Sequence, residues 1–225
     1  MEKLDYKKEY KDLYMPKTKP VLINVPNMKF IMVKGKGNPN AENGEYQEAL
    51  SILYGLSFTI KMSKMGTNKI DGYFEYVVPP LEGFWWNEGS QNVDYNHKEK
   101  FEWISMIRQP EFVTESIFEW ALQELKKKKG LDVSKAEFKE FKEGLCVQMM
   151  HIGSYDNEPE TICKIEEYIK SNNLKNDIGG LLENSIIRRH HEIYLSDPRR
   201  TEVKKLKTVI RIPVIEEEKT INMEV

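Results

Sequence analysis

The sequence lacks the features that mark secreted, disulfide-stabilised and membrane proteins. It contains two cysteines in 225 residues, Cys146 and Cys163, in no metal or redox spacing. Neither a disulfide framework nor a cysteine-ligated metal site is therefore expected. No apolar run reaches the roughly 18 residues that a membrane span needs, and the polar first 14 residues lack the apolar region of a signal peptide. We expect a cytoplasmic protein with no membrane partner.

A strong excess of one charge is also missing. The chain has 34 Lys and Arg against 36 Asp and Glu, a net charge of −2. Such a balance gives no long-range field that would attract nucleic acid. The basic run Lys126–Lys129 is followed by Gly130, a pattern typical of a solvated helix C-terminus. No helix-turn-helix pattern is evident, so we expect no nucleic-acid partner.

Motifs of covalent, phosphate and metal chemistry are scarce as well. The chain has no G-x-S-x-G element, and GKGNPN at 35–40 is turn punctuation that precedes no phosphate-binding helix. His190 and His191 are adjacent, so in a strand they point to opposite faces and cannot share a metal ion. We therefore expect neither a metal site nor a cofactor.

Periodicity predicts an α+β protein. Apolar residues recur at helical spacing over 45–62 and 157–170, and over a linking helix at 113–129. Extended segments bounded by turn residues predict strands at 29–36, 81–86, 101–108, 144–152, 190–195 and 208–215. The order strand, helix, strand, strand thus occurs twice. We predict one domain over 1–225 built from two βαββ halves, about 21–110 and 111–215, related by a pseudo-twofold axis. An antiparallel sheet would carry its helices on one face, with a groove between the halves on the other.

The strand HHEIYL at 190–195 carries the residue of greatest chemical interest. If Ile193 and Leu195 face the helical layer, Glu192 lies mid-strand on the opposite face. A carboxylate there is either a solvated surface residue or the charged floor of a pocket. Several aromatic residues need cover from solvent: Tyr73, Trp85, Trp86, Trp103 and Tyr194. They are either ordinary core residues or walls that would stack on a flat, apolar, often cationic ligand next to Glu192.

The sequence resembles the GyrI-like small-molecule-binding family, related to the DNA gyrase inhibitory protein and to effector domains of multidrug-responsive transcription regulators. The resembling segments are DYKKEYKDLY, VPNMKFIMVKGKGNPN, ALSILYGLSFTIK, VVPPLEGFWW and HHEIYLSDPRRTEVKKLKTVIR. The resemblance implies a duplicated βαββ fold with a ligand groove and a central acidic residue, which maps onto Glu192. Trp85 and Trp86 are the first choices for its wall, with Tyr73 and Trp103 as further ligand-binding candidates.

Some stand-alone members of this family hydrolyse the cyclopropane ring of DNA-alkylating natural products of the yatakemycin and CC-1065 type, using a glutamate and a tyrosine. The glutamate matches Glu192, while Tyr54 and Tyr194 are both candidates for the tyrosine. The resemblance therefore implies hydrophobic or cationic aromatic small molecules as partners, and we expect the protein to be a monomer. Two alternatives are a multidrug-binding protein without catalysis and a gyrase-inhibitor-like interaction protein, for which the EEEKTINMEV terminus is the candidate contact.

Overall fold

The structure is a computed structural model that describes residues 3–66, 69–182 and 186–217. Its helices are α1 (Tyr6–Glu9), α2 (Lys11–Tyr14), α3 (Glu45–Lys61), α4 (Glu115–Lys129) and α5 (Glu158–Ser171). Its strands are β1 (Val21–Lys36), β2 (Leu81–Asn87), β3 (Phe101–Gln109), β4 (Ala136–Ile152), β5 (Leu174–Asn176), β6 (His190–Tyr194) and β7 (Lys207–Glu216). Short 3-10 turns occupy Ser63–Met65, Lys98–Lys100, Tyr155–Asn157 and Val203–Lys205.

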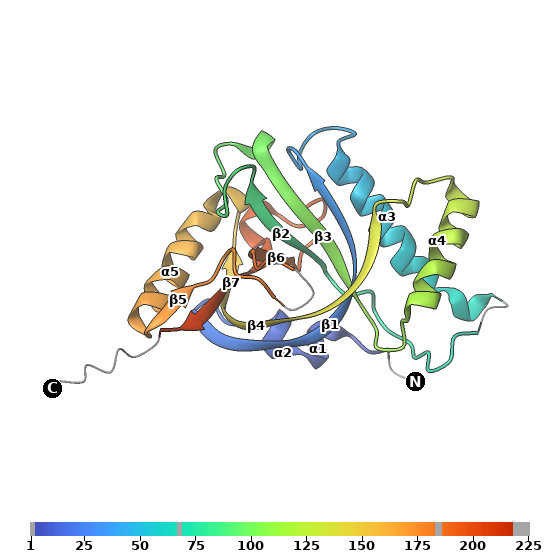
Figure 1. The fold of residues 1–225 in the computed structure, drawn as a ribbon, viewed down its shortest axis with the longest axis horizontal. Helices are drawn as coiled ribbons and strands as arrows, with labels where there is room; N and C mark the ends of the chain where they lie inside the picture. Colours follow the sequence, from blue (N-terminus) through green and yellow to red (C-terminus); the bar gives the residue numbers. More distant parts are fainter. Residues whose placement is uncertain (1–2, 67–68, 183–185, 218–225) are drawn as a thin grey trace.

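The strands form an antiparallel sheet that curls into a barrel-like ring (Figure 1). The order is β4-β1-β3-β2-β6-β7-β5, and an additional pairing of β4 with β7 closes a ring of six strands. Each half of the chain supplies three adjacent strands, with β2 pairing β6 and β1 pairing β4 where the halves meet. The predicted antiparallel sheet with helices is therefore present, while the duplication and pseudo-twofold symmetry stay predictions.

Strands β1 and β4 are longer than the sequence pattern predicted. They pair from Val21 opposite Gln148 to Val33 opposite Ala136, with one interruption. Pro26 has no N–H to donate, and it falls between the pairs Val25–Gly144 and Asn27–Lys142, where the ladder has a gap. Gly144 has a φ of 79°, a left-handed conformation that glycine adopts readily. The resulting bend lets both strands follow the curve of the ring.

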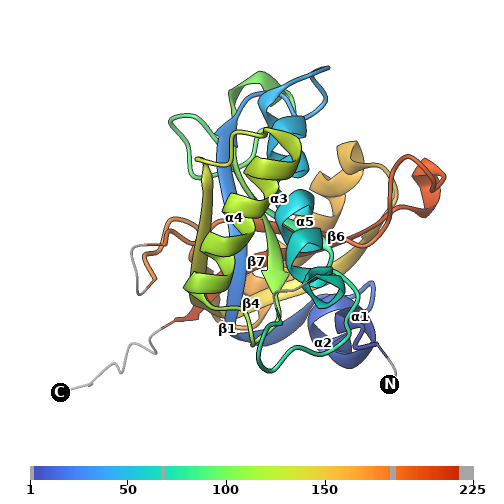
Figure 2. The ribbon, with the colours of Figure 1, turned by 90° about the vertical axis from the view of Figure 1, so that its right-hand side faces the viewer.

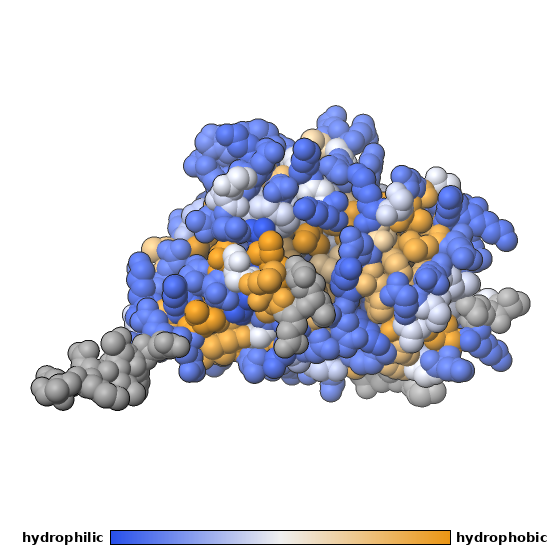
Figure 3. Space-filling model, in the orientation of Figure 1, coloured by the Kyte–Doolittle hydropathy of each residue, from blue (hydrophilic) through white to orange (hydrophobic). Residues whose placement is uncertain are grey.

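Helices α3, α4 and α5 pack on the outside of the ring, as two orthogonal views show (Figures 1 and 2). Ile31 and Val33 of β1 face α3 and α4, while Ile210 and Ile212 of β7 face α5. Figure 3 shows apolar side chains exposed in patches among hydrophilic ones, including over the α3–α4 side. None of the helices among the described residues is both long enough and apolar enough to cross a membrane.

Side chains of the described residues fill the sheet face away from the helices, so among these residues that face does not carry the groove that we expected there. Phe30, Met106 and Ile193 point into the ring and pack in one apolar cluster. The N-terminal segment joins them, because Tyr6, Leu13 and Tyr14 are buried in the same cluster. Ile193 therefore faces the interior of the ring, and the expectation that it faces the helices was wrong. Alternation along β6 gave the two faces correctly but could not say which face the helices cover.

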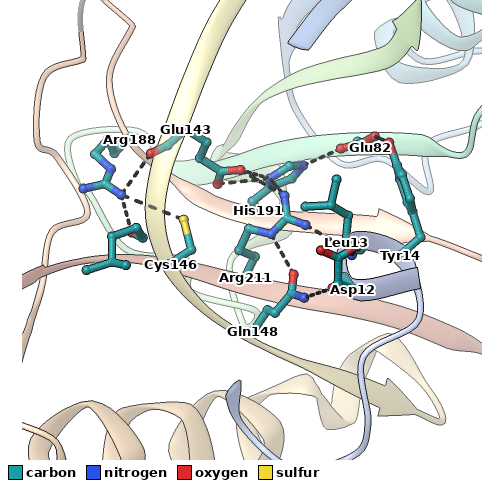
Figure 4. Close-up of polar contacts among 11 residues, drawn as sticks. Asp12, Leu13, Tyr14, Glu82, Glu143, Cys146, Gln148, Arg188, His191 and Arg211 are labelled. Carbon is teal, nitrogen blue, oxygen red and sulfur yellow. Dashed lines mark hydrogen bonds and ion pairs between the residues drawn. The ribbon is translucent and has the colours of Figure 1, made fainter. Parts of the chain in front are cut away.

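A buried ion cluster crosses the interior and reaches the N-terminal segment (Figure 4). His191 Nδ1 lies 3.1 Å from Glu143 Oε2, and its Nε2 lies 3.0 Å from Glu82 Oε2. Arg211 donates from Nη1 to Glu143 Oε2 at 3.0 Å and from Nη2 to the carbonyl oxygen of Leu13 at 3.1 Å. Tyr14 completes the connection by donating to Glu82 Oε1 at 3.3 Å. Strands β2, β4, β6 and β7 are thereby joined to the segment before β1.

Opposite charges keep this cluster ionised despite its burial. Burial alone would raise the pKa of Glu143, but the charges of His191 and Arg211 and their hydrogen bonds outweigh it and lower the pKa to about 2. Burial would likewise lower the pKa of His191. The charge and hydrogen bond of Glu143, helped by Glu82, raise that pKa above its ordinary value instead. The protonated form of His191 therefore persists to higher pH in the folded protein than in the unfolded chain.

Replacing Arg211 with Met should destabilise the fold by about 3–5 kcal/mol, because Glu143 would stay buried without its guanidinium partner. Chemical denaturation followed by circular dichroism measures the change. Arg199→Met is the matched control, since Arg199 is exposed and pairs with the nearby Asp197. A loss of stability no larger for Arg211→Met than for Arg199→Met would contradict the assigned role of the cluster.

The raised pKa of His191 predicts a loss of stability at alkaline pH. Its contribution is fully present below the unfolded pKa of about 6.5 and is lost as pH rises through the folded value. Denaturation midpoints measured between neutral and alkaline pH should fall in the wild type. In His191→Gln the denaturation midpoint should be lower than in the wild type near neutral pH and should change less with pH. If the midpoints of the two proteins change equally with pH, another group is responsible for the loss of stability.

Candidate functional site

A cavity of about 1820 Å³ lies on the helix-bearing face of the sheet. It runs between α3 and the start of α5, over the outward side chains of β2 and β6, and under the loop that joins β6 to β7. This volume exceeds the roughly 300–1,000 Å³ of ordinary small-molecule sites. The aromatic residues that matter most to its shape are Tyr46, Tyr54, Trp85, Tyr95, Tyr155 and Tyr194. The cavity is therefore large enough and aromatic enough for a planar, polycyclic ligand.

Glu192 lines this cavity from the middle of β6 and is 5% exposed. The carboxylate accepts hydrogen bonds from Tyr194 at 2.7 Å on Oε2 and from Tyr95 at 3.4 Å on Oε1. His190 Nε2 lies 2.9 Å from Oε1. We expected Glu192 in a groove on the sheet face away from the helices, and it lies instead in a cavity on the face that carries the helices.

Hydrogen bonding decides the charge state of Glu192. Burial alone would raise the pKa of its carboxyl group. The hydrogen bond and electrostatic attraction of His190, followed by the hydrogen bonds of Tyr194 and Glu158, outweigh burial and lower the pKa below its ordinary value. At neutral pH the floor of the cavity therefore carries a negative charge. A charge held by three donors in an apolar wall attracts a cation or activates a water molecule.

A second carboxyl group, Glu158, faces Glu192 across Tyr95. Glu158 is the first residue of α5, and it is fully buried. The hydroxyl oxygen of Tyr95 lies 3.1 Å from Glu158 Oε2, while Glu158 Oε1 accepts no hydrogen bond from any described residue. Burial, the charge of Glu192 and a hydrogen bond between the two carboxyl groups raise the pKa of Glu158 well above its ordinary value. Glu158 is therefore the protonated member of the pair.

Trp85 supplies a flat wall and a free hydrogen-bond donor. Its indole lies over Gly83, where an added Cβ would come within 2.7 Å of the indole nitrogen. Gly83 pairs with Glu192 across the β2–β6 ladder, so the missing side chain lets the ring approach the strand that carries the carboxylate. The Nε1–H of Trp85 has no partner among the described residues. It is available to a ligand oxygen or to a water molecule.

The two candidate tyrosines occupy different parts of the cavity. Tyr194 lies beside Glu192 and donates to it, and its ring makes an edge contact with Tyr155 at 5.9 Å. Tyr54 lines the cavity from α3, stacks on Phe58 at 6.5 Å and is 37% exposed. Tyr194 is thus the one of the two that is bonded to the central carboxylate.

Three of the aromatic residues expected at the ligand lie elsewhere. Trp86 follows Trp85 in β2, so it points to the opposite face, where Arg189 stacks on its ring at 4.3 Å. Trp103 is fully buried behind the cavity wall, in edge contact with Tyr46 at 5.1 Å. Tyr73 donates to the carbonyl oxygen of Lys61 and packs in the interior cluster. Of the ligand-binding candidates, Trp85 and Glu192 line the cavity, and Trp103 supports it from behind.

The sequence reasoning missed Glu158, Tyr95 and His190. His190 could have been found, because it lies two residues before Glu192 and alternation places both on one face. Tyr95 belongs to the polar connection between β2 and β3, which has no periodicity. Glu158 has no distinguishing sequence signal, because acidic residues are common in the first turn of a helix. Within the described part of the chain, no group of His, Cys, Asp and Glu is placed to hold a metal ion.

Comparison with known proteins points to one family. Residues 18–215 match the model of the GyrI-like small molecule binding domain. No curated protein matches the chain significantly.

Three solved structures show how closely the fold is shared. An uncharacterized conserved protein from Listeria innocua is 48% identical, with a TM-score of 0.86, over 95% of this chain and 100% of its own. A hydrolase from Listeria innocua is 45% identical, with a TM-score of 0.83, over the same shares of the two chains. The C-terminal domain of EcmrR is 10% identical with a TM-score of 0.51, over 88% of this chain and 98% of its own. This last likeness concerns the fold alone.

The adjacent tryptophans give a matched test of the cavity. Trp85→Leu should raise the Kd of a planar cationic dye roughly two- to tenfold, because stacking on an aromatic face is worth about 0.5–1.5 kcal/mol. Trp86→Leu changes the same residue type on the opposite face of β2 and should leave the affinity unchanged. Equilibrium fluorescence titration measures both. Equal losses in the two variants would mean that the dye binds outside this cavity.

Proposed function

Because the chain belongs to the GyrI-like family of small-molecule-binding domains, we propose that it binds planar, hydrophobic, often cationic compounds and hydrolyses cyclopropanoid DNA-alkylating compounds. The observation that carries the proposal is the nearly buried Glu192 carboxylate, with three hydrogen-bonding neighbours, beside the aromatic walls of one cavity. The walls would stack on the flat ligand, and the carboxylate would meet its cationic group or its attacking water. We propose in addition that this cavity, on the helix-bearing face, is the groove between two βαββ halves of the chain.

The proposed reaction is the addition of water across a strained carbon–carbon bond. In a spirocyclopropane conjugated to a dienone, water attacks the exposed ring carbon and a C–O bond forms. The cyclopropane bond breaks, and its electron pair moves to the carbonyl oxygen, which becomes a phenolate. Glu192 takes the proton of the attacking water as general base. Such assistance is typically worth about 10²–10⁴-fold in rate.

The hydrogen bonds of Glu192 support this role. Tyr194 and His190 hold both carboxylate oxygens, which limits rotation of the side chain before the reaction. We assign Tyr194 as the tyrosine that assists Glu192, and Tyr54 as part of the wall around the distal end of the ligand. The similarity to a hydrolase from Listeria innocua at 45% identity favours catalysis over binding alone.

Two other functions would use different parts of the protein. A sequestering protein would use the same cavity without turnover, and the experiment below separates it from an enzyme. An interaction protein of the gyrase-inhibitor type would use the C-terminal segment, of which residues 218–225 lie outside the described residues. The cavity, with its buried carboxylate, favours small-molecule chemistry. We expect the protein to act as a monomer.

Glu192→Gln should separate binding from catalysis. The variant keeps the size of the side chain but removes its charge and its basicity. It should bind cationic dyes more weakly, bind a neutral cyclopropanoid as before, and hydrolyse that compound about 10²-fold more slowly or worse. Mass spectrometry of the water adduct and fluorescence titration provide the two measurements.

Glu202→Gln is the control, because Glu202 is an exposed acid paired with Lys205. If the wild-type protein binds the cyclopropanoid without forming the water adduct, hydrolysis is excluded and sequestration remains as the function. Full turnover in Glu192→Gln would assign the base to another residue.

A further inference from the structure

The second buried carboxyl group gives the cavity an acid as well as a base. Glu158 comes from α5 and Glu192 from β6, and the hydroxyl of Tyr95 lies between them, 3.1 Å from Glu158 Oε2 and 3.4 Å from Glu192 Oε1. A hydroxyl can accept one hydrogen bond while it donates another. The three groups can therefore form a chain in which Glu158 donates to Tyr95 and Tyr95 donates to Glu192.

The hydrogen-bond partners of the two carboxyl groups are unequal. Glu192 is held by Tyr194, Tyr95 and His190, so both of its oxygens have partners. Glu158 has Tyr95 and the carboxyl group of Glu192 as neighbours, and its Oε1 accepts no hydrogen bond from any described residue. A buried carboxylate needs donors to offset the loss of water, whereas a carboxylic acid needs fewer. The contacts therefore favour the charge on Glu192 and the proton on Glu158.

The surrounding charges agree with that assignment. Burial and the charge of Glu192 raise the pKa of Glu158, while the hydrogen bond of Tyr95 and the charge of Lys98 lower it by less. The N-terminus of α5 also favours a charged Glu158, by about 0.3–1 kcal/mol, which is less than one pKa unit. Tyr155 lies nearby as a neutral phenol whose pKa burial raises to about 12. The opposing effects are too small to ionise Glu158.

The tyrosine hydroxyls nearest Glu192 are poorer proton donors. Those of Tyr194 and Tyr95 are already directed at carboxyl oxygens. Burial, with the negative charge of Glu192, raises the pKa of both phenols further above the ordinary value. A carboxylic acid gives up its proton more readily than a phenol of raised pKa. Paired carboxyl groups whose environments differ in this way divide the roles of acid and base in other enzymes.

We propose that Glu158 is the proton donor of the site and that Tyr95 connects it to Glu192. The proposal rests on the hydrolysis described above. As the cyclopropane bond breaks, Glu158 gives its proton to the developing phenolate oxygen while Glu192 takes one from the attacking water. The product is the neutral phenol, and the net change is the addition of one water molecule.

The bridge through Tyr95 explains how the site returns to its starting state. After the reaction Glu158 is charged and Glu192 holds the proton. Glu192 then donates to Tyr95 as Tyr95 donates to Glu158, which restores the original arrangement without a proton from solvent. The hydroxyl oxygen of Tyr95 lies 3.1 Å from Glu158 Oε2 and 3.4 Å from Glu192 Oε1, so both contacts must shorten toward the usual length of about 2.7–2.8 Å as the protons move.

Infrared difference spectroscopy locates the proton without any turnover. The wild type at neutral pH should show the carbonyl band of a protonated carboxylic acid that is missing in Glu158→Gln and retained in Glu192→Gln. Glu160→Gln is the matched control, because Glu160 is exposed on the first turn of the same helix. A band that persists in Glu158→Gln, or that Glu192→Gln removes instead, would overturn the assignment.

Turnover of a cyclopropanoid then tests the donor role. Glu158→Gln should lower kcat by roughly 10²–10⁴-fold and leave the Kd of a neutral planar ligand unchanged. Tyr95→Phe should keep the infrared band and a normal first turnover but slow the later ones, because the return path is broken. Unchanged kcat in Glu158→Gln would overturn the proposal. A wild type that converts no cyclopropanoid would end the hydrolase proposal and the donor role together, while the infrared result decides the position of the proton independently.

Discussion

The pairing of β6 between β2 and β7 is the constraint on which the rest of the structure depends. Side chains alternate along a strand, so His191 enters the ion cluster of the ring while Glu192 enters the cavity. A slip of one residue would exchange the two, placing the imidazole in the cavity and the carboxylate against Glu82 and Glu143. The fixed pairing of His191 with two glutamates opposes that slip. The ion cluster and the cavity therefore depend on a single register.

The two faces of β6 stabilise buried charge in different ways. Inside the ring, Glu143 lies between the cationic groups of His191 and Arg211, so opposite charges meet directly. In the cavity, Glu192 is held by hydroxyl and imidazole groups, and Glu158 avoids a second charge by keeping its proton. The paired charges of the interior act as a scaffold. The floor of the cavity keeps the negative charge of Glu192, and Trp85 Nε1 and Glu158 Oε1 have no hydrogen-bond partner among the described residues, which are the properties of a binding site.

Several helices and strands were predicted correctly from the sequence. Helical spacing identified α3 and α5, and the two-residue period of HHEIY correctly put Glu192 opposite Ile193. Adjacent Trp85 and Trp86 were both assigned to one wall, although neighbouring strand residues face opposite sides. Closure of the ring, which decides which face is interior, depends on the β4–β7 pairing between distant segments. Tyr95 lies in an irregular connection, so tertiary packing alone brings it to Glu192.

Closure of the ring also determines which parts of the protein can adapt to ligands. Separating β2 from β6 would break backbone hydrogen bonds in a ladder whose neighbours are themselves paired, so the floor of the cavity is stiff. Its other boundaries are side chains of α3, the start of α5 and the loop after β6, none of which is a member of that ladder. Under the proposed function, adjustments of these walls would accommodate compounds of different outline above a floor of constant shape. Glu192 would then keep one position whichever compound is bound.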